Sequence, residues 1–263
     1  MSTYVISDMH GRMDLFLKML EKIGFSENDH LYCLGDAADR GPKGIEILLL
    51  LMQMDNVTYI CGNHDLMFTK AVRRAVQMGY SEKALNTEEF QLWMLNGGAS
   101  TWNRYIELER SVRREILAYI GNSYLLIPQL KVGEHYFYLC HATHAERPIL
   151  EPLLLKNADR QTIEHVVWER TYPRPRRKFS KKDIFYPEIY NRYPKKTTMI
   201  FGHTPTPVFA RPDSNGRGHI WHGGNGHLID IDCGCAMGSE FGYLACLRIN
   251  ETDGQIKEVI YMR

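Results

Sequence analysis

Short apolar runs and longer amphipathic stretches alternate along the first quarter of the chain. Three runs rich in Val, Ile, Tyr and Cys, at 4–7, 30–34 and 57–61, predict β-strands. Between them, apolar residues recur at helical spacing over 14–23 and 44–54. Strands that alternate with helices in this way are typical of a βαβαβ unit with parallel strands. We therefore expect an α/β fold.

The pattern changes after this unit. Residues 66–120 are polar and have helical periodicity over 68–78, 87–95 and 105–119, with an interruption at 96–98. We expect a helical excursion that packs on the core or forms a cap beside it. Later β patterns, which predict a second sheet, lie at 124–127, 136–140, 199–201, 227–233, 243–249 and 257–261.

One stretch of the second half has no clear periodicity. Residues 146–198 are rich in Pro and charged side chains, and we expect an irregular basic insertion there. With that insertion and the helical excursion, 263 residues fit one domain that covers 1–263.

Composition excludes some classes of protein. The net charge is +1, so we expect no membrane partner and no stable complex with nucleic acid. The longest apolar run, 45–54, is shorter than the ~20 residues of a membrane-spanning helix, and no secretory signal is visible. We expect a cytoplasmic protein whose cysteines are reduced and buried. These cysteines are Cys33, Cys61, Cys140, Cys233, Cys235 and Cys246.

Polar clusters follow each of the first three predicted strands. The carboxyl ends of parallel strands meet at one edge of a sheet, where ligands gather. The clusters are Asp8-Met9-His10-Gly11, Gly35-Asp36-Ala37-Ala38-Asp39-Arg40-Gly41 and Gly62-Asn63-His64-Asp65. Carboxylate, imidazole and amide oxygen atoms suit divalent cations, and two buried carboxylates need compensating positive charge. His141 and His203 also follow predicted strands, so they add two candidate ligands.

In order and spacing, these motifs resemble those of the calcineurin-like metallophosphoesterases, and most of all the phosphoprotein phosphatase branch. Within it, the chain is similar to the short bacterial and phage serine/threonine phosphatases and to the symmetrical diadenosine tetraphosphatases. The resemblance is dense over 8–65 and sparse elsewhere. It implies two mixed β-sheets packed face to face, with helices outside and a helical or irregular cap.

The resemblance also implies a role for each motif residue. Asp8, His10 and Asp36 would hold one metal ion, and Asp36, Asn63, His141 and His203 the second. Catalysis would rest on His64 as proton donor, Asp39 as its partner, and Arg40 with Arg170 as phosphate ligands; Asn63 would also face the phosphate. Arg170 is chosen for its Trp-x-Arg context, Trp168-Glu169-Arg170.

Such a centre hydrolyses phosphate esters by attack of a metal-activated hydroxide. The cofactors would be two divalent ions, with manganese expected and iron, zinc or nickel left open. Our first expectation for the substrate is phosphoserine or phosphothreonine in proteins, so the partner would be a phosphorylated protein or a nucleotide. The alternative is a symmetrical dinucleoside polyphosphate hydrolase, extending to RNA 5′ ends. Two weaker alternatives remain. One is a nuclease or phosphodiesterase that uses the same pair of metal ions, and the other is an inactive binding module that kept the fold.

Several further residues have polar or charged side chains but are not among the expected ligands. Asp65 stands where eukaryotic relatives carry Glu, and we expect it to contact no ligand. The basic stretch 170–182 is either a solvated loop or a positive rim that attracts phosphorylated substrates. The histidines of the glycine-rich region 216–227 are expected in a mobile loop, without ligand roles. Asp230 and Asp232 are expected to form structural hydrogen bonds rather than to bind metal.

Overall fold

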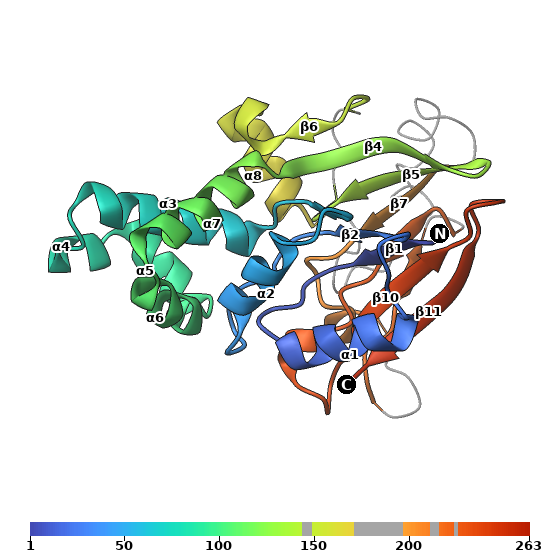
Figure 1. Ribbon diagram of the computed structural model, residues 1–263, viewed down its shortest axis with the longest axis horizontal. Coiled ribbons are helices and arrows are strands. Elements are labelled where there is room, and N and C mark those ends of the chain that lie inside the picture. Colours follow the sequence, from blue (N-terminus) through green and yellow to red (C-terminus); the bar gives the residue numbers. More distant parts are fainter. Residues whose placement is uncertain (144–148, 171–196, 211–215, 224–225) are drawn as a thin grey trace.

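The computed structural model describes residues 1–143, 149–170, 197–210, 216–223 and 226–263. Its strands form two sheets (Figure 1). The first sheet has the order β11 (Ile256–Met262), β10 (Leu244–Ile249), β1 (Thr3–Ile6), β2 (His30–Cys33) and β3 (Val57–Tyr59). The second has the order β6 (Leu153–Leu154), β4 (Tyr124–Val132), β5 (His135–Cys140), β7 (Thr197–Phe201), β9 (Leu228–Asp230) and β8 (Trp221–Gly223).

Both sheets mix parallel and antiparallel pairs. Strands β1, β2 and β3 are parallel, whereas β10 runs antiparallel to β1 and to β11. In the second sheet β5, β7 and β9 are parallel, and β4 and β8 pair antiparallel with their neighbours. The parallel strands therefore bring the loops after β1, β2, β5 and β7 toward one region, which is where the candidate site residues lie.

The core confirms that the sheets pack face to face. Val5 and Leu247 of the first sheet share one buried cluster with Phe137, Leu139 and Ile200 of the second. Alternate residues of the same strands point the other way, as the two-residue period of a strand requires. They pack in a second cluster with helices α1 (Met13–Ile23), α2 (Gly44–Leu51) and α8 (Arg160–Trp168), which lie outside the sheets.

A group of helices extends from one end of the sheets, on the left of Figure 1. It contains α3 (Asn63–Gln77), α4 (Glu82–Leu85), α5 (Glu88–Leu95), α6 (Ala99–Glu107) and α7 (Arg110–Asn122). Aromatic side chains hold it together, with Phe68 5.3 Å from Trp93 and 5.2 Å from Tyr105 between ring centroids. We call α4 to α6 the helical lobe.

Three boundaries differ from the sequence expectations. Helix α3 begins at Asn63, not at 68, so a candidate ligand opens the helix. The helix expected over 105–119 is broken, because Leu108 and Glu109 both adopt extended backbone between α6 and α7. Part of the glycine-rich region that was expected to be a mobile loop forms β8.

The segment expected to be irregular contains regular elements. Strand β6, a 3₁₀ turn at Leu155–Asn157 and helix α8 lie within it. Asp159 caps α8, since its side chain accepts a hydrogen bond from Thr162 N at 2.8 Å. Most of the basic stretch 170–182 lies outside the described residues. All six cysteines are buried and unpaired. Among the described residues, no helix combines the length and the apolar character needed to cross a membrane.

Candidate metal centre

The loops that carry the candidate residues have unusual backbone geometry. Residues other than glycine rarely adopt positive φ, and strain of this kind concentrates at functional sites. Here six polar residues adopt it: Asp8, His10, Asp36, Asp39, Arg40 and His203. Among the other described non-glycine residues, only Tyr80 and Gln129 do so. The fold therefore accepts strained conformations at the positions that the motifs mark.

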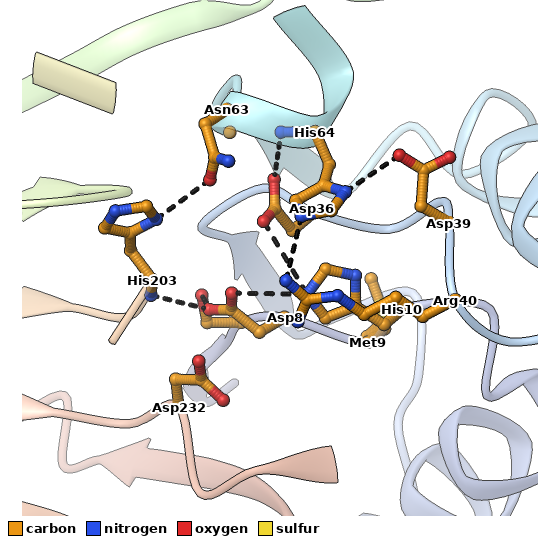
Figure 2. A network of polar contacts seen from close by, with 12 residues as sticks. Asp8, Met9, His10, Asp36, Asp39, Arg40, Asn63, His64, His203 and Asp232 are labelled. Carbon is orange, nitrogen blue, oxygen red and sulfur yellow. Dashed lines mark hydrogen bonds and ion pairs between the residues drawn. The ribbon is translucent and has the colours of Figure 1, made fainter. Parts of the chain in front are cut away.

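Asp8 and Asp36 each use one carboxylate oxygen for the backbone and leave the other facing the cluster (Figure 2). Asp8 Oδ2 accepts hydrogen bonds from Ser7 Oγ and from His203 N. Asp8 Oδ1 is buried without a hydrogen bond and lies 3.8 Å from His10 Nε2. Asp36 Oδ1 accepts the His64 N–H at 2.9 Å. Asp36 Oδ2 lies 3.7 Å from His10 Nε2 and 3.5 Å from His141 Nε2. One oxygen of Asp36 thus faces two groups of candidate ligands.

Backbone carbonyls fix the orientation of two imidazoles. His10 Nδ1 lies 3.1 Å from Ala38 O and His141 Nδ1 lies 2.7 Å from Leu34 O. A carbonyl only accepts, so each Nδ1 carries a proton and, in a neutral ring, each Nε2 presents a lone pair. This is the usual arrangement of metal-binding histidines, in which one ring nitrogen is held by an outer partner.

The second group of ligands gathers around Asn63 at the first residue of α3. Asn63 Oδ1 lies 3.0 Å from His141 Nε2 and 2.8 Å from His203 Nδ1. The rings of His141 and His203 are 5.2 Å apart between centroids. A neutral His141 thus directs its Nε2 lone pair at two oxygens, Asn63 Oδ1 and Asp36 Oδ2, and such convergence of acceptors suits a cation.

The spacings fit metal coordination. Two atoms that bind one ion at ~2.1 Å lie roughly 3 to 3.5 Å apart, close to the separations around Asn63 and Asp36. Asp8, Asp36 and His141 form one group whose candidate ligand atoms lie within 4.8 Å of one another, and His10, Asp36 and His64 form another. In the latter group His64 differs from His10 in that its Nδ1 faces a carboxylate, Asp39 Oδ2, rather than a backbone carbonyl.

Two glycines allow the loops to approach the carboxylates. A Cβ atom at Gly62 would lie 2.1 Å from Asp36 Oδ1, and one at Gly202 would lie 2.1 Å from Asp8 Oδ2. Real Cβ atoms do not come so near, so only glycine fits at these positions. The glycines of the Gly-Asn-His and Gly-His motifs are therefore required by packing against the ligands.

Burial governs protonation in the cluster. It raises the pKa of Asp36 well above its ordinary value, because a charged carboxylate loses its hydration there. Burial lowers the pKa of His10 and His203, with Arg40 adding to the effect at His10 and His141 at His203. The lowered pKa values favour the neutral form of His10 and His203, and the neutral form is the one that binds metal. Positive charge at the centre would favour the ionised form of Asp36.

His64 and Asp39 form a buried pair beside the cluster. His64 Nδ1 lies 2.8 Å from Asp39 Oδ2, and both side chains are almost inaccessible to solvent. Asp39 Oδ2 also accepts the Trp93 indole N–H at 2.8 Å. Since Asp39 can only accept when ionised, His64 carries its proton on Nδ1.

Arg40 lies between the His64–Asp39 pair and the candidate ligand His10. Its Nη1 donates to His10 Nε2 at 2.9 Å and its Nη2 to His64 Nε2 at 3.0 Å. Arg170 follows α8 at the protein surface, near enough for its positive charge to contribute to the lowered pKa of His203. The structure thus places Arg40 at the cluster and Arg170 at its outer side.

A model of the calcineurin-like phosphoesterases matches residues 1–234 of the chain. The chain belongs to this family. Calcineurin-like phosphoesterases use a dinuclear divalent metal centre, and the groups of ligands around Asp36 are candidates for it.

Several curated relatives of this phosphoesterase are symmetrical bis(5′-nucleosyl)-tetraphosphatases. That of Aliivibrio fischeri is 25% identical, and the match covers 95% of this chain and 96% of the relative. That of Buchnera aphidicola subsp. Baizongia pistaciae is 44% identical over 68 residues, which cover 25% of this chain and 24% of the relative. The stronger identity is thus confined to a short segment of both proteins.

Solved structures share the fold. A protein described as a candidate diadenosine tetraphosphatase superposes with a TM-score of 0.59 and 17% identity, covering 100% of this chain and 94% of the other. A cold-active protein-tyrosine phosphatase from a psychrophilic Shewanella species gives 0.56 and 16%, covering 100% and 80%.

Some residues at the site of this phosphoesterase are not evident in its sequence. The expectation that Asp65 contacts no candidate ligand is wrong, because Asp65 Oδ2 accepts the backbone N–H of Asp36 at 3.1 Å and that of Gly62 at 2.8 Å. A helix capping pattern, with an acid three residues after Gly62, was a signal that could have found it. Trp93 and Thr101, which contact Asp39, carried no such signal.

Asp230 and Asp232 form the structural hydrogen bonds that were expected of them. Asp230 Oδ1 accepts the N–H of Asp232, and Asp232 Oδ1 accepts the N–H of Gly234. Asp232 lies near Asp8 in Figure 2. Burial raises the pKa of both acids well above the ordinary value, and the charge of Asp8 adds to this at Asp232.

Proposed function

We propose that this phosphoesterase hydrolyses symmetrical dinucleoside polyphosphates, with diadenosine tetraphosphate as the representative substrate. The observation that carries the hydrolytic chemistry is the position of Asp36 Oδ2 between His10 Nε2 and His141 Nε2, with His64 and Arg40 at one side. The choice of substrate is supported by relatives of that name which align along nearly the whole chain, as the Aliivibrio proteins do.

Two ligand sets would share Asp36. Asp8, His10 and Asp36 would hold the first ion, and Asp36, Asn63, His141 and His203 the second. When bound, two divalent ions polarise the phosphoryl group and lower the pKa of water. Ionised Asp8 and Asp36 supply only two negative charges to this centre, so it keeps a positive charge that attracts phosphate. Manganese is our first choice of ion, on the resemblance alone.

His64 would give a proton to the leaving oxygen. Asp39 accepts from Nδ1, so the reactive nitrogen is Nε2, which faces Arg40. The Arg40 guanidinium has no hydrogen-bond acceptor, so it must leave His64 Nε2 when that nitrogen is protonated. Phosphate oxygens offer its guanidinium a bidentate alternative, so substrate binding would free His64 to act.

Arg40 and Arg170 would bind the phosphoryl oxygens, with the Asn63 amide beside them. Arg40 is already held against the cluster by two imidazoles. Arg170 is exposed at the outer side, where its side chain can reach a ligand that enters from solvent. Together they would balance the negative charge that accumulates on phosphorus oxygens during in-line displacement.

Phosphoserine or phosphothreonine hydrolysis in proteins, our first expectation from the motifs, is the second candidate. The motif resemblance supports it. The two Aliivibrio relatives, which align along nearly the whole chain, bear the dinucleotide name, and this favours dinucleotides over phosphoproteins.

The two candidates can be separated with purified, manganese-loaded protein. We expect diadenosine tetraphosphate to be hydrolysed with a higher kcat/KM than a phosphoserine peptide, and to give ADP as the sole nucleotide product. AMP and ATP would indicate asymmetric cleavage. A higher kcat/KM on the phosphopeptide would refute the dinucleotide proposal and support the protein phosphatase.

A further inference from the structure

A groove of about 640 Å³ lies beside the candidate ligands Asn63, His141 and His203. Three helices line it, with Leu66 and Met67 from α3, Leu92 from α5 and Trp168 from α8. Its volume falls in the range of small-molecule sites, ~300–1,000 Å³. None of these side chains has a part in the proposed chemistry, so the groove has no assigned role.

The groove adjoins the metal centre through Trp168. The indole of Trp168 meets the imidazole of His203 edge-on, with 6.0 Å between ring centroids and an interplanar angle of 88°. Leu66 and Met67 follow Asn63 by one helical turn. A ligand whose phosphate is bound at the centre can therefore extend along the groove without leaving the protein.

An ion pair crosses the groove farther out. Lys70 of α3 and Glu164 of α8 bind each other through Nζ and Oε1 and join the two helices. With a helical rise of 1.5 Å per residue, Glu164 lies ~6 Å along α8 from Trp168, and Lys70 lies ~10 Å along α3 from Asn63. The compartment between the centre and this ion pair is therefore short and suits one compact group.

The lining favours a flat, largely apolar and uncharged group. Leu66 and Met67 are nearly buried, Leu92 is half exposed, and the partly exposed indole of Trp168 offers a surface for stacking. Carboxylates of Glu88, Glu89 and Glu164 outnumber the cations of Lys70 and Arg160. The groove is thus poorly suited to a phosphate chain, which has Arg40 and Arg170 at the inner end.

We infer that this groove binds the nucleoside of a nucleotide substrate, with its base stacked on Trp168 while its phosphates lie at the metal centre. The carboxylates of Glu88 and Glu89 stand at the groove as acceptors for an exocyclic amino group such as that of adenine. The inference rests on the proposed function, since it names the part of the dinucleotide substrate that the groove receives.

Calorimetry with the product ADP and with inorganic phosphate tests it. The dissociation constants of both are measured on manganese-loaded wild type, Trp168→Ala, Trp168→Phe and the control Leu95→Ala. Leu95 is 85% exposed on α5 and outside the groove. The ratio of the two dissociation constants reports the contribution of the nucleoside alone. A disturbance of His203 would weaken the binding of ADP and of phosphate alike and would leave the ratio unchanged. We expect Trp168→Ala to raise the ADP-to-phosphate ratio at least about fivefold, as the loss of one base–aromatic stack does.

Trp168→Phe, which keeps an aromatic face, should restore most of the ratio, and Leu95→Ala should keep it. An unchanged ratio in Trp168→Ala, or an equal loss in Trp168→Phe, would overturn the inference. A higher KM for a phosphopeptide in Trp168→Ala, without a change in the ADP ratio, would overturn it too and assign the groove to peptide. If wild type binds ADP by way of Trp168 but does not cleave diadenosine tetraphosphate, the proposed function fails and the groove assignment stands.

Discussion

The N-terminal strands and the helical lobe meet at Asp39, and they contribute to the site in different ways. The loops after β1 and β2 supply Asp8, His10 and Asp36, whose side chains face the cluster. The lobe supplies no side chain to the candidate ligand groups. It contacts the Asp39–Arg40 turn instead, through Trp93, Thr101 and Gly97.

These contacts hold a strained turn. Asp39 and Arg40 have φ values of 69° and 63°. Asp39 N donates to Thr101 Oγ1 at 2.9 Å, Arg40 N donates to Gly97 O at 2.9 Å, and Trp93 Nε1 donates to Asp39 Oδ2 at 2.8 Å. Unusual backbone persists only where surrounding structure over-determines it. The lobe is therefore a positioning element, and a motif that lists only ligands does not reveal it.

Asp36→Asn tests the strand side and should have the largest effect. It removes the charge that the two ligand sets share, so kcat/KM should fall roughly a thousandfold or more, or ~4 kcal/mol of transition-state stabilisation. Burial raises the pKa of Asp36 and thus disfavours its charge, so the metal-free variant should be at least as stable as wild type. Thermal unfolding monitored by circular dichroism checks the fold. A large loss of stability would mean that the activity result reports misfolding.

His64→Ala tests the residue between the two regions. Loss of the proton donor should slow phenyl phosphate, whose leaving group is poor, by ~10²–10⁴, and p-nitrophenyl phosphate far less. Metal content, measured by mass spectrometry of the purified variant, should stay at the wild-type level. Equal slowing of both esters would argue against a role as the acid.

Trp93→Phe tests the lobe. The ring volume is largely kept and the N–H donor to Asp39 is lost, so phenyl phosphate hydrolysis should slow by ~10-fold, as is usual for an outer hydrogen-bond partner. The slowing should be greater for phenyl phosphate than for p-nitrophenyl phosphate. Trp102→Phe is the matched control, because Trp102 packs against Trp93 and Phe90 in the same aromatic cluster. If both variants slow the two esters equally, the lobe contributes only packing.

The smallest effect is a pH-dependent gain in stability from metal. Asp36 has a raised pKa in the metal-free fold, so its favourable contribution is present at low pH and lost as pH rises. His10 and His203 have lowered pKa values, so their contribution is present above ~6.5 and lost as pH falls. Bound metal offsets the unfavourable burial of the ionised Asp36 carboxylate at higher pH. At lower pH, protons compete with the metal for the same ligand atoms. The increase in Tm on adding manganese should therefore be larger at about pH 8 than at about pH 6.

Trp93→Phe should keep this pH-dependent increase, because the lobe does not touch the ligands. Differential scanning fluorimetry, with and without a chelator, provides the measurement. An increase in Tm that is constant or larger at the lower pH would contradict the assignment of Asp36 as a ligand.

Sequence patterns predicted the ligand loops because the end of a strand can be recognised from a few neighbouring residues. Asp8, Asp36 and Asn63 each follow an apolar run, and parallel pairing brings such positions together. The contacts of Trp93 and Thr101 with Asp39 join segments more than fifty residues apart, and helical periodicity in the lobe carries no trace of them. The break between α6 and α7 has no Gly or Pro to mark it.

Gly62 and Gly202 show how closely the ligand loops pack against one another. Each presses its backbone against a carboxylate, one from the loop after β2 and one from the loop after β1. A methyl group at Gly62 would push apart two loops of the first sheet, and one at Gly202 would push a loop of the second sheet away from the loop after β1. Alanine at Gly62 or Gly202 should thus act as a spacer, which widens the distance between ligand sets while leaving every ligand in the sequence.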